Sequence, residues 1–473
     1  MICIPIVSET TDKAIEDMNK ASKLADLIEV RADYIKSPDL KKILSAREKP
    51  LIITIMPEQE NGKFKGTEQE RIALLKQAME LGADYIDVNL GCTELNNLIK
   101  NREATKVIVS YHNFEETPSD LDEIYNKIKS TGADIVKMAT FANKLSDNLK
   151  VLNLVKKSDK KIIAICMGQL GEISRILAPL YGSYLTFASL ETGKESAPGQ
   201  IPAETLKNIY RIHGIKPGFN IYGLIGNPVS KSKGYVLFNS LFRQYELNSI
   251  YINFQVVDLE DFAKSFPEML SGFSITMPHK QEIMNCLDEI DPNAKKIGAV
   301  NTVVNKGGKL TGYNTDMTGA IKTIQGKTEI HNKHVTILGA GGTARAIAFG
   351  IIEKGGRLTI LNRTVAKAEK LAGELRCSFG PLSDFEKLRT DILINTTSVG
   401  MHPHTGEAPV STDNVRNMVV FDTIYNPEKT VLLKEAEKNN CVIISGIEMF
   451  INQAAEQFRL FTGIQPDTRL FSL

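Results

Sequence analysis

Short apolar runs of strand type alternate with amphipathic stretches of helical period throughout residues 1–215. The eight runs are Ile2–Val7, Leu27–Val30, Leu51–Ile55, Tyr85–Val88, Val107–Val109, Ile135–Met138, Ile162–Ile165 and Tyr184–Phe187. Helical patterns separate them, as at Glu68–Leu81 and at Asp120–Thr131, which follows a Pro-Ser start signal. Eight β–α repeats predict a closed (β/α)8 barrel over residues 1–215. The period alone also fits an open parallel sheet.

The pattern changes after residues 213–220 (HGIKPGFN), which contain two glycines, a proline and few core candidates. Such a composition is typical of a linker. Further strand-like runs follow at Tyr222–Gly226, Ile252–Val257 and Gly272–Thr276. The chain ends on an amphipathic run, Glu448–Thr462, that predicts a closing helix.

One stretch of the second half, HVTILGAGGTARA, predicts a strand, a tight glycine turn and a helix. The spacing Gly339-x-Gly341-x-x-Ala344 fits a dinucleotide site, in which backbone N–H groups and a helix N-terminus meet a pyrophosphate. A second strand, Leu358–Leu361, follows at βαβ distance, and then comes Arg363. An acidic residue there would favour NAD, whereas arginine suits the 2′-phosphate of NADP. The alternative is a glycine-rich helix start that binds nothing.

Composition limits the classes of protein to consider. With 473 residues, 42% hydrophobic and 24% charged, we expect a soluble globular protein of two or three domains. The 57 basic and 56 acidic residues nearly cancel, so we expect no nucleic-acid or membrane partner. Even the most apolar long window, residues 335–352, contains Arg345 and is no membrane span.

The cysteines and histidines suggest neither disulfides nor a metal. Six cysteines lie far apart without a CxxC pair, and the seven histidines form no HExxH cluster. The start, MICIPIVSET, is too short and too soon acidic for a signal peptide. We therefore expect reduced thiols in a cytoplasmic protein.

Polar residues gather where the barrel strands are expected to end, which is where barrels carry their chemistry. They are Glu29, Arg31, Glu58, Glu60, Ser110, Tyr111, His112, Lys137, Ser174, Arg175, Ser196 and Gln200. A lysine leaving an apolar strand is desolvated, so we expect the pKa of Lys137 to fall and its amine to attack a ketone. A histidine such as His112 can then remove the acidified proton, and arginines can hold a carboxylate. Taken alone, Lys137 is better interpreted as a lysine at a strand end that reaches water. The alternative for His112 is a loop histidine that caps backbone groups.

The segments EVRADY, VIVSYHNFEETP, GADIVKMA, GEISRILAPLYGSYLTFASL and SAPGQI resemble the type I 3-dehydroquinate dehydratase family over nearly all of residues 1–215. The resemblance implies Lys137 as the Schiff-base lysine, His112 as the proton carrier and Glu60 beside it. It also implies substrate contacts at Glu29, Arg31, Arg175, Ser196 and Gln200. One position departs from the family, because Met56 stands where an arginine is usual. A substrate contact is therefore missing or supplied elsewhere, for example by Lys63 or Lys65.

The segments GNPVSKS, SITMPHK, GAVNTVV, GYNTDMTG, LGAGGTARA, NRT, NTTSVGM, DTIYNP and GIEMFINQA together resemble shikimate dehydrogenase from about residue 221 to 473. The resemblance implies NADPH-dependent, reversible reduction of 3-dehydroshikimate with Lys280 and Asp316 as the catalytic pair. The implied substrate positions are Ser230, Ser232, Thr276, Asn301, Tyr425 and Gln453. The implied cofactor positions are Gly339, Ala340, Gly341, Gly342, Thr343, Ala344, Asn362, Arg363, Thr364, Lys367, Thr423 and Gly446.

The same resemblance divides the second half into two lobes. It implies a substrate-binding lobe at residues 221–320, completed by residues 450–473, and an NADP-binding Rossmann domain at 321–449. Here too a motif departs from the family, which commonly reads HSxSP where this chain reads KSKGY. Lys231 replaces the histidine and Gly234 the second serine, so one hydroxyl contact to the substrate carboxylate is lost. A nearby lysine or the backbone N–H of Gly234 is the candidate substitute.

Together the two halves predict a bifunctional enzyme whose barrel makes the substrate of its dehydrogenase half. No GxxxxGK[ST] run occurs, so we expect no ATP use. Two alternatives remain. In the first, the dehydrogenase half prefers quinate or uses NAD. In the second, the chain is a regulator that binds the metabolites without turnover, and the departures at Met56 and Gly234 are compatible with that.

Overall fold

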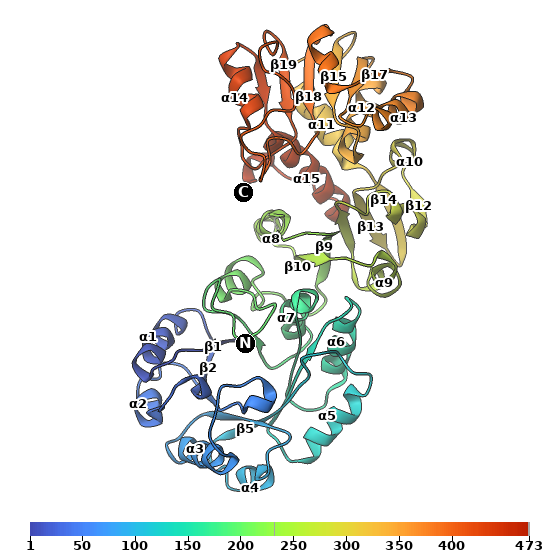
Figure 1. Ribbon diagram of the computed structural model, residues 1–473. Helices are drawn as coiled ribbons and strands as arrows, with labels where there is room; N and C mark the ends of the chain where they lie inside the picture. Colours follow the sequence, from blue (N-terminus) through green and yellow to red (C-terminus); the bar gives the residue numbers. More distant parts are fainter. Residues whose placement is uncertain (231, 472–473) are drawn as a thin grey trace. The chain divides into compact units, whose positions relative to one another are not determined.

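The computed structural model describes residues 1–230 and 232–471 (Figure 1). They form two compact units, Met1–Gly223 with Pro228–Phe266, and Leu224–Asn227 with Pro267–Leu473. The border between the units falls inside the lobe expected at residues 221–320. The three-part division made from the sequence stays a prediction.

Eight parallel strands form the core of the first unit in the order β7-β6-β5-β4-β3-β2-β1-β8. They are β1 Ile2–Ile6, β2 Leu27–Arg31, β3 Leu51–Thr54, β4 Tyr85–Asn89, β5 Lys106–His112, β6 Ile135–Phe141, β7 Ile162–Met167 and β8 Thr186–Phe187. Each coincides with a predicted apolar run. β8 pairs with β1. On its other side, Tyr184 N, two residues before β8, donates to the O of Ile162, the first residue of β7, at 2.7 Å. The ring of strands therefore nearly closes, and the barrel is confirmed over the open sheet.

Helices cover the outside of this ring (Figure 1). They are α1 Thr11–Ala21, α2 Leu40–Ser45, α3 Glu68–Glu80, α4 Leu95–Lys100, α5 Leu121–Ser130, α6 Asp147–Lys157 and α7 Glu172–Leu180. Helix α3 begins where its sequence predicts, because Thr67 and Glu70 form a capping box. Inside the ring, alternate strand residues such as Leu27, Ile52 and Ile108 form a buried cluster. This filled interior leaves only the strand ends open to chemistry.

The first unit also contains elements that follow the barrel in the chain. A π-helical turn occupies Thr205–Ile209, and α8 Gly234–Gln244, β10 Ser249–Gln255 and α9 Leu259–Ser265 come later. Strand β9, Asn220–Gly226, crosses the border between the two units. The strands predicted at 222–226 and 252–257 are thus present. The second begins three residues earlier than predicted and ends two residues earlier.

The second unit begins with a mixed sheet in which β11, β13, β14 and β12 are neighbours in that order. Their bounds are β11 Gly272–Ile275, β12 Glu289–Ile290, β13 Thr302–Lys306 and β14 Lys309–Tyr313. Strand β13 is antiparallel to β11 and β14, whereas β12 is parallel to β14. Two helices accompany the sheet, α10 Pro292–Ile297 and α11 Thr315–Gln325.

A second sheet of this unit is wholly parallel, with the order β17-β16-β15-β18-β19-β20. Its strands are β15 His334–Leu338, β16 Arg357–Leu361, β17 Ser378–Gly380, β18 Ile392–Asn395, β19 Val419–Asp422 and β20 Val442–Ile444. Helices α12 Gly342–Glu353, α13 Val365–Leu375, α14 Val431–Lys438 and α15 Gly446–Thr462 complete it. Numbered from β15, this is the 3-2-1-4-5-6 order of the dinucleotide-binding fold, as the glycine turn predicts.

Helix α15, which contains the predicted closing run, packs closely against α11. A Cβ atom placed on Gly319 of α11 would lie 2.8 Å from the Gln453 Cβ and 2.9 Å from its backbone nitrogen. The helix starts at a capping box formed by Ser445 and Glu448, two residues before the predicted start. The last part of the chain therefore packs beside residues of the 315–325 segment.

The close packing at Gly319 predicts a loss of stability in Gly319→Ala. Because the added methyl group meets backbone atoms, the helices must separate, and we expect unfolding free energy to fall by about 1–3 kcal/mol. The matched control is Gly373→Ala in helix α13, where the added Cβ would meet nothing within 4 Å. That change should raise stability by about 0.4–1 kcal/mol. Urea unfolding followed by circular dichroism compares them, and equal effects would contradict the packing.

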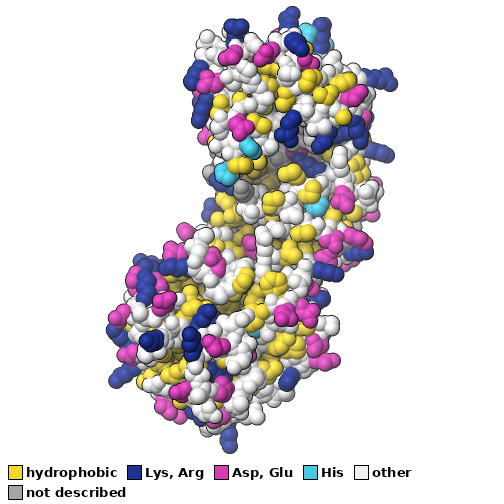
Figure 2. Space-filling view, viewed as in Figure 1, with side chains coloured by type: hydrophobic (Ala, Val, Ile, Leu, Met, Phe, Trp, Pro, Cys, Tyr) yellow, Lys and Arg dark blue, Asp and Glu magenta, His cyan; other side chains and the backbone are white. Residues whose placement is uncertain are grey.

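Two surface observations bear on partners. No helix among residues 1–230 and 232–471 combines the length and the apolar character needed to span a membrane. Figure 2 shows basic and acidic side chains interspersed over the face in view.

Candidate active sites

A cavity of about 360 Å³ opens at the C-terminal ends of the barrel strands. Eight of the residues predicted from the sequence line it, namely Glu29, Arg31, Glu60, His112, Lys137, Arg175, Ser196 and Gln200. The other four, Glu58, Ser110, Tyr111 and Ser174, do not belong to its lining. The parallel strands thus bring distant residues to one mouth, while the role of each residue stays a prediction.

Lys137 on β6 is 5% exposed and is surrounded by two carboxylates and a ring. Its Nζ lies 2.6 Å from Asp87 Oδ2 and 3.6 Å from Glu29 Oε1. The same atom lies 4.6 Å from the centroid of the Phe187 ring. Burial by itself lowers the pKa of Lys137, but the carboxylates of Asp87 and Glu29 outweigh it and raise the pKa above the ordinary value. The expectation of a lowered pKa is therefore wrong for the free protein, which holds an ammonium.

His112, at the end of β5, is oriented by a carboxylate. Its Nδ1 lies 3.0 Å from Glu60 Oε2, and the His112 ring stacks on Phe114 at 5.9 Å between centroids. Because Glu60 occupies Nδ1, the other ring nitrogen, Nε2, is the one available to exchange a proton in the cavity. Glu60 thus stands where it can orient the imidazole.

The two arginines of the cavity differ in their partners. Arg31 is held by Asp33, with Nε 2.8 Å from Oδ1 and Nη2 2.7 Å from Oδ2. Arg175 is fully buried and donates only to backbone carbonyls, at Phe187 (3.5 Å) and Pro198 (3.2 Å). Burial lowers the pKa of Arg175 to about 10. A buried cation with no carboxylate at ion-pair distance among the described residues favours an anionic ligand, so Arg175 is the stronger candidate for a substrate carboxylate.

Ser196 and Gln200 are bonded to each other at the rim of the cavity. Ser196 N donates to Gln200 Oε1 at 2.8 Å, and Gln200 Nε2 donates to Ser196 Oγ at 3.0 Å. Met56 also lines the cavity, so a thioether occupies the place of the family's arginine. Lys63 and Lys65 are exposed and do not belong to the lining.

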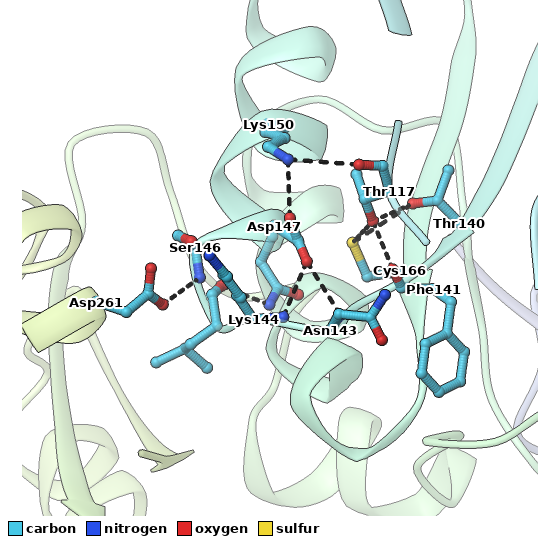
Figure 3. Close-up of polar contacts among 12 residues, drawn as sticks. Thr117, Thr140, Phe141, Asn143, Lys144, Ser146, Asp147, Lys150, Cys166 and Asp261 are labelled. Atoms are coloured by element: carbon cyan, nitrogen blue, oxygen red, sulfur yellow. Dashed lines mark hydrogen bonds and ion pairs between the residues drawn. The ribbon is translucent and has the colours of Figure 1, made fainter. Parts of the chain in front are cut away.

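Figure 3 shows polar contacts of Thr117, in the loop after β5, and of the segment after β6 that contains Asp147. Thr117 Oγ1 donates to Phe141 O at 2.8 Å and lies 3.7 Å from Cys166 Sγ. Lys150 bridges Asp147 Oδ1, at 2.9 Å, and Thr117 O, at 3.4 Å. Burial raises the pKa of Cys166 to about 11, so this sulfur remains a thiol. The network fixes the loop that carries Phe114 beside the cavity.

Sequence reasoning missed Asp87, the closest carboxylate to Lys137. Asp87 is 3% exposed on β4. The signal was present, because an acidic residue inside the apolar run YIDV seldom occurs without a buried partner. Strand counting selected residues where the apolar runs were expected to end and passed over one that lies within a run.

In the second unit, Lys280, Asp316 and Asn301 form a connected polar group. Lys280 Nζ lies 2.5 Å from Asp316 Oδ2, and Asn301 Nδ2 donates to Asp316 Oδ1 at 2.8 Å. The structure thus brings together the predicted catalytic pair from two distant segments. The side chain of Asn314 accepts a hydrogen bond from Met317 N and caps helix α11.

Gln457 is a second residue that sequence reasoning missed. It is 2% exposed, and its Nε2 donates to Asn301 O at 3.2 Å and to Thr302 Oγ1 at 2.9 Å. It lies one helical turn after Gln453, and this i, i+4 spacing was the available signal. Gln453 itself packs against Gly319, and Thr276 N donates to Ile225 O at 2.9 Å.

Ser230 and Ser232 belong to the first unit. Ser232 Oγ accepts a hydrogen bond from Gly234 N at 3.3 Å, so the backbone N–H proposed as a substitute contact has an internal partner. Lys231 lies outside the described residues.

The glycine turn after β15 has the geometry of a phosphate cradle. Gly339 has φ +113°, and a Cβ there would lie 2.4 Å from Thr396 Oγ1. A Cβ on Gly341 would meet nothing within 4 Å, which leaves open space at the N-terminus of α12. A Cβ on Gly342 would lie 3.8 Å from Lys280 Cδ, so the turn borders the Lys280–Asp316 pair. The residues present therefore fit a dinucleotide next to a proton donor.

The remaining cofactor candidates also follow strand ends of this sheet. Asn362, Arg363 and Thr364 come directly after β16, and Lys367 lies in the first turn of α13. Arg363 is exposed and has no ion pair within the described part of the chain. Thr423 N donates to Asn395 O at 3.0 Å, and the Tyr425 ring lies 5.3 Å from that of Phe450. A Cβ on Gly446 would lie 2.5 Å from the backbone of Ile424, so only glycine fits there.

Family models match four successive segments of the chain. Residues 2–217 match Type I 3-dehydroquinase, and residues 224–303 match the shikimate dehydrogenase substrate binding domain. Residues 321–428 match Shikimate / quinate 5-dehydrogenase, and residues 446–471 the shikimate 5'-dehydrogenase C-terminal domain. A bifunctional 3-dehydroquinate dehydratase/shikimate dehydrogenase of Arabidopsis thaliana, chloroplastic by name, is 39% identical over 502 residues, which cover 100% of this chain and 83% of that protein. The chain belongs to this bifunctional family.

Two further proteins agree with this membership of the bifunctional dehydratase/dehydrogenase family. The shikimate biosynthesis protein AroDE of Chlamydia pneumoniae is 32% identical over 469 residues, covering 98% of this chain and 95% of its own length. A crystal structure of a shikimate dehydrogenase in complex with NADP+ is 40% identical with a TM-score of 0.51. It covers 54% of this chain and 94% of its own.

Proposed function

We propose that the barrel dehydrates 3-dehydroquinate and that the second half reduces the resulting 3-dehydroshikimate to shikimate with NADPH. The observation that carries this proposal is the pairing of two sites in one chain. One holds a buried lysine beside a carboxylate-oriented histidine, and the other a Lys–Asp pair bordering a glycine cradle. The product of the first reaction is the substrate of the second.

In the proposed dehydration, Arg175 pairs with the substrate carboxylate, and the ketone comes against Lys137. The amine of Lys137 condenses with the ketone, and the iminium withdraws electrons from the neighbouring carbon. His112, held by Glu60, removes the proton from that carbon and returns one to the departing hydroxyl. Glu29, Arg31, Ser196 and Gln200 contact the substrate's hydroxyl and carboxylate groups.

In the proposed reduction, Lys280 donates a proton to the oxygen of the ketone as it becomes an alcohol. Asp316 keeps the amine of Lys280 charged and in place, and Asn301 holds the other oxygen of Asp316. NADPH supplies the hydride when bound in the glycine cradle. Ser230, Ser232, Thr276, Tyr425 and Gln453 are the proposed substrate contacts. The proposed cofactor contacts are Gly339, Ala340, Gly341, Gly342, Thr343, Ala344, Asn362, Arg363, Thr364, Lys367, Thr423 and Gly446.

Arg363 supports NADP over NAD, and Arg363→Ala tests this preference. We expect the KM for NADPH to rise about 10- to 100-fold, because one charge-assisted contact to the 2′-phosphate is lost. The KM for NADH should change little. Arg357→Ala is the matched control, since this arginine is exposed at the opposite end of the same strand. Equal losses for both cofactors would remove the 2′-phosphate role.

A metabolite-binding regulator is the second candidate, and Met56 and Gly234 favour it because each replaces a family contact. The purified chain is given 3-dehydroquinate with and without NADPH, and the absorbances of dehydroshikimate and of NADPH are followed. Appearance of the diene, and its consumption after NADPH is added, supports two working sites. If neither absorbance changes while the metabolites raise the melting temperature, the chain is a sensor. Quinate with NAD+ in the same assay tests the quinate- or NAD-preferring alternative.

We further propose that the protein is cytoplasmic, that its partners are these small molecules, and that it binds neither nucleic acid nor a membrane. The near balance of charge and six free cysteines support this location.

A further inference from the structure

Two carboxylates face the Lys137 nitrogen, and their surroundings differ. Glu29 lines the cavity, accepts a hydrogen bond from Thr54 Oγ1 at 2.8 Å and lies 3.6 Å from Nζ. Asp87 does not line the cavity, is 3% exposed and lies 2.6 Å from Nζ. A substrate entering the cavity therefore meets Glu29 and leaves the Asp87–Lys137 contact in place.

The neighbouring strands place Asp87 at a fixed depth in the barrel. Residue 89 of β4 pairs with Ser110 of β5, and Ser110 pairs with Lys137 of β6. Asp87 is two residues earlier on β4, so it stands deeper in the barrel than Lys137 does. Both side chains are held by buried strands, and neither has the freedom of a loop residue.

The condensation of an ammonium with a ketone conserves charge at the nitrogen. The R–NH3+ group and the C=O group give R–NH+=C and one water molecule, whose oxygen comes from the ketone and whose two hydrogens come from the nitrogen. The nitrogen is cationic before and after this step. A carboxylate that stays beside the nitrogen can therefore form an ion pair with the ammonium and with the iminium.

We infer that Asp87 is the catalytic counterion of the Lys137 nitrogen, paired first with the ammonium and then with the iminium. Its charge favours the protonated iminium, which is the form that withdraws electrons from the neighbouring carbon. Glu29 remains free to contact the substrate. This inference rests on the proposed Schiff base at Lys137.

The test compares Asp87→Asn with Glu29→Gln, which also removes a carboxylate near Nζ. Two quantities are measured by peptide mass spectrometry. The first is the amount of substrate fixed on Lys137 by borohydride. The second is the pH dependence of Lys137 carbamylation by cyanate, which reacts with the neutral amine, and exposed Lys100 in the same sample is the reference.

In Asp87→Asn, carbamylation of Lys137 should begin at a pH lower by about one unit or more, and the fixed adduct should fall about tenfold or more. Glu29→Gln should shift carbamylation less. Asp87→Glu keeps the charge and should restore part of both. Dehydrogenase activity of the same chain reports the amount of folded second unit, and thermal unfolding of each variant checks the barrel.

An unchanged carbamylation profile in Asp87→Asn overturns the inference, and so does a full yield of adduct. If Asp87→Asn fails to fold, Asp87→Glu decides by itself. A role that does not depend on charge predicts the unaltered carbamylation profile and a full yield of adduct only when residue 87 has the side-chain length of aspartate. Absence of a Lys137 adduct in the unaltered protein would instead overturn the Schiff base, and the counterion with it.

Discussion

Lys137→Ala is expected to abolish dehydration of 3-dehydroquinate, with a fall in kcat of at least about 10⁴-fold. Without the amine no iminium forms, so the neighbouring C–H keeps its ordinary acidity and His112 has no activated proton to remove. The change also leaves Asp87 as a buried carboxylate without its cation, which costs barrel stability of about 3–5 kcal/mol. The rate is measured by the absorbance of 3-dehydroshikimate.

Two controls separate lost chemistry from lost structure. Reduction of 3-dehydroshikimate by the same variant should proceed at the normal rate, because the Lys280–Asp316 pair lies in the second unit. Lys100→Ala removes an exposed lysine of the barrel and should leave dehydration unchanged. A Lys137→Ala protein that dehydrates at the normal rate would show that the Schiff-base proposal is wrong.

Lys280→Ala should give the reciprocal result. We expect kcat for reduction of 3-dehydroshikimate to fall about 10²- to 10⁴-fold, because the proton that Lys280 donates to the ketone oxygen is lost. Dehydration should remain intact. The rate is followed by the absorbance of NADPH.

Lys295→Ala, an exposed lysine on helix α10, is the matched control for Lys280→Ala. Titration of the Lys280→Ala protein with NADPH shows whether the cradle still binds, since Lys280 borders Gly342. A variant that binds NADPH and reduces the ketone at the normal rate would remove Lys280 from the proposed mechanism.

The barrel illustrates how far pattern alone reaches. The eight runs became eight strands because a parallel strand buried on both faces must be largely apolar. The glycine turn became the predicted cradle because a side chain at Gly339 would collide with Thr396, and only one residue type meets that demand. The sequence records demands of this kind because each one restricts the residue type at the position itself.

The pKa of Lys137 illustrates the opposite case. Its sign depends on carboxylates that lie 50 and 108 positions away in the chain, since the residue numbers differ as 137 − 87 and 137 − 29. The two arginines share a residue type but differ in partners. Arg31 pairs with Asp33, whereas the hydrogen bonds of Arg175 go to the backbone carbonyls of Phe187 and Pro198. An electrostatic environment is a sum over spatial neighbours, and composition does not contain it.

By itself the sequence determined the order of strands and helices, the barrel and dinucleotide-binding architectures, and most of the residues that meet at each candidate site. Periodicity, glycine turns and strand ends carry that information because each is a short-range constraint on the backbone. Only the tertiary structure decided that Asp87 and Gln457 belong beside the chemistry, that Lys137 is charged in the free protein, and that Arg175 has no carboxylate at ion-pair distance among the described residues. Those properties arise where segments far apart in the chain come within a few ångströms, which folding alone brings about.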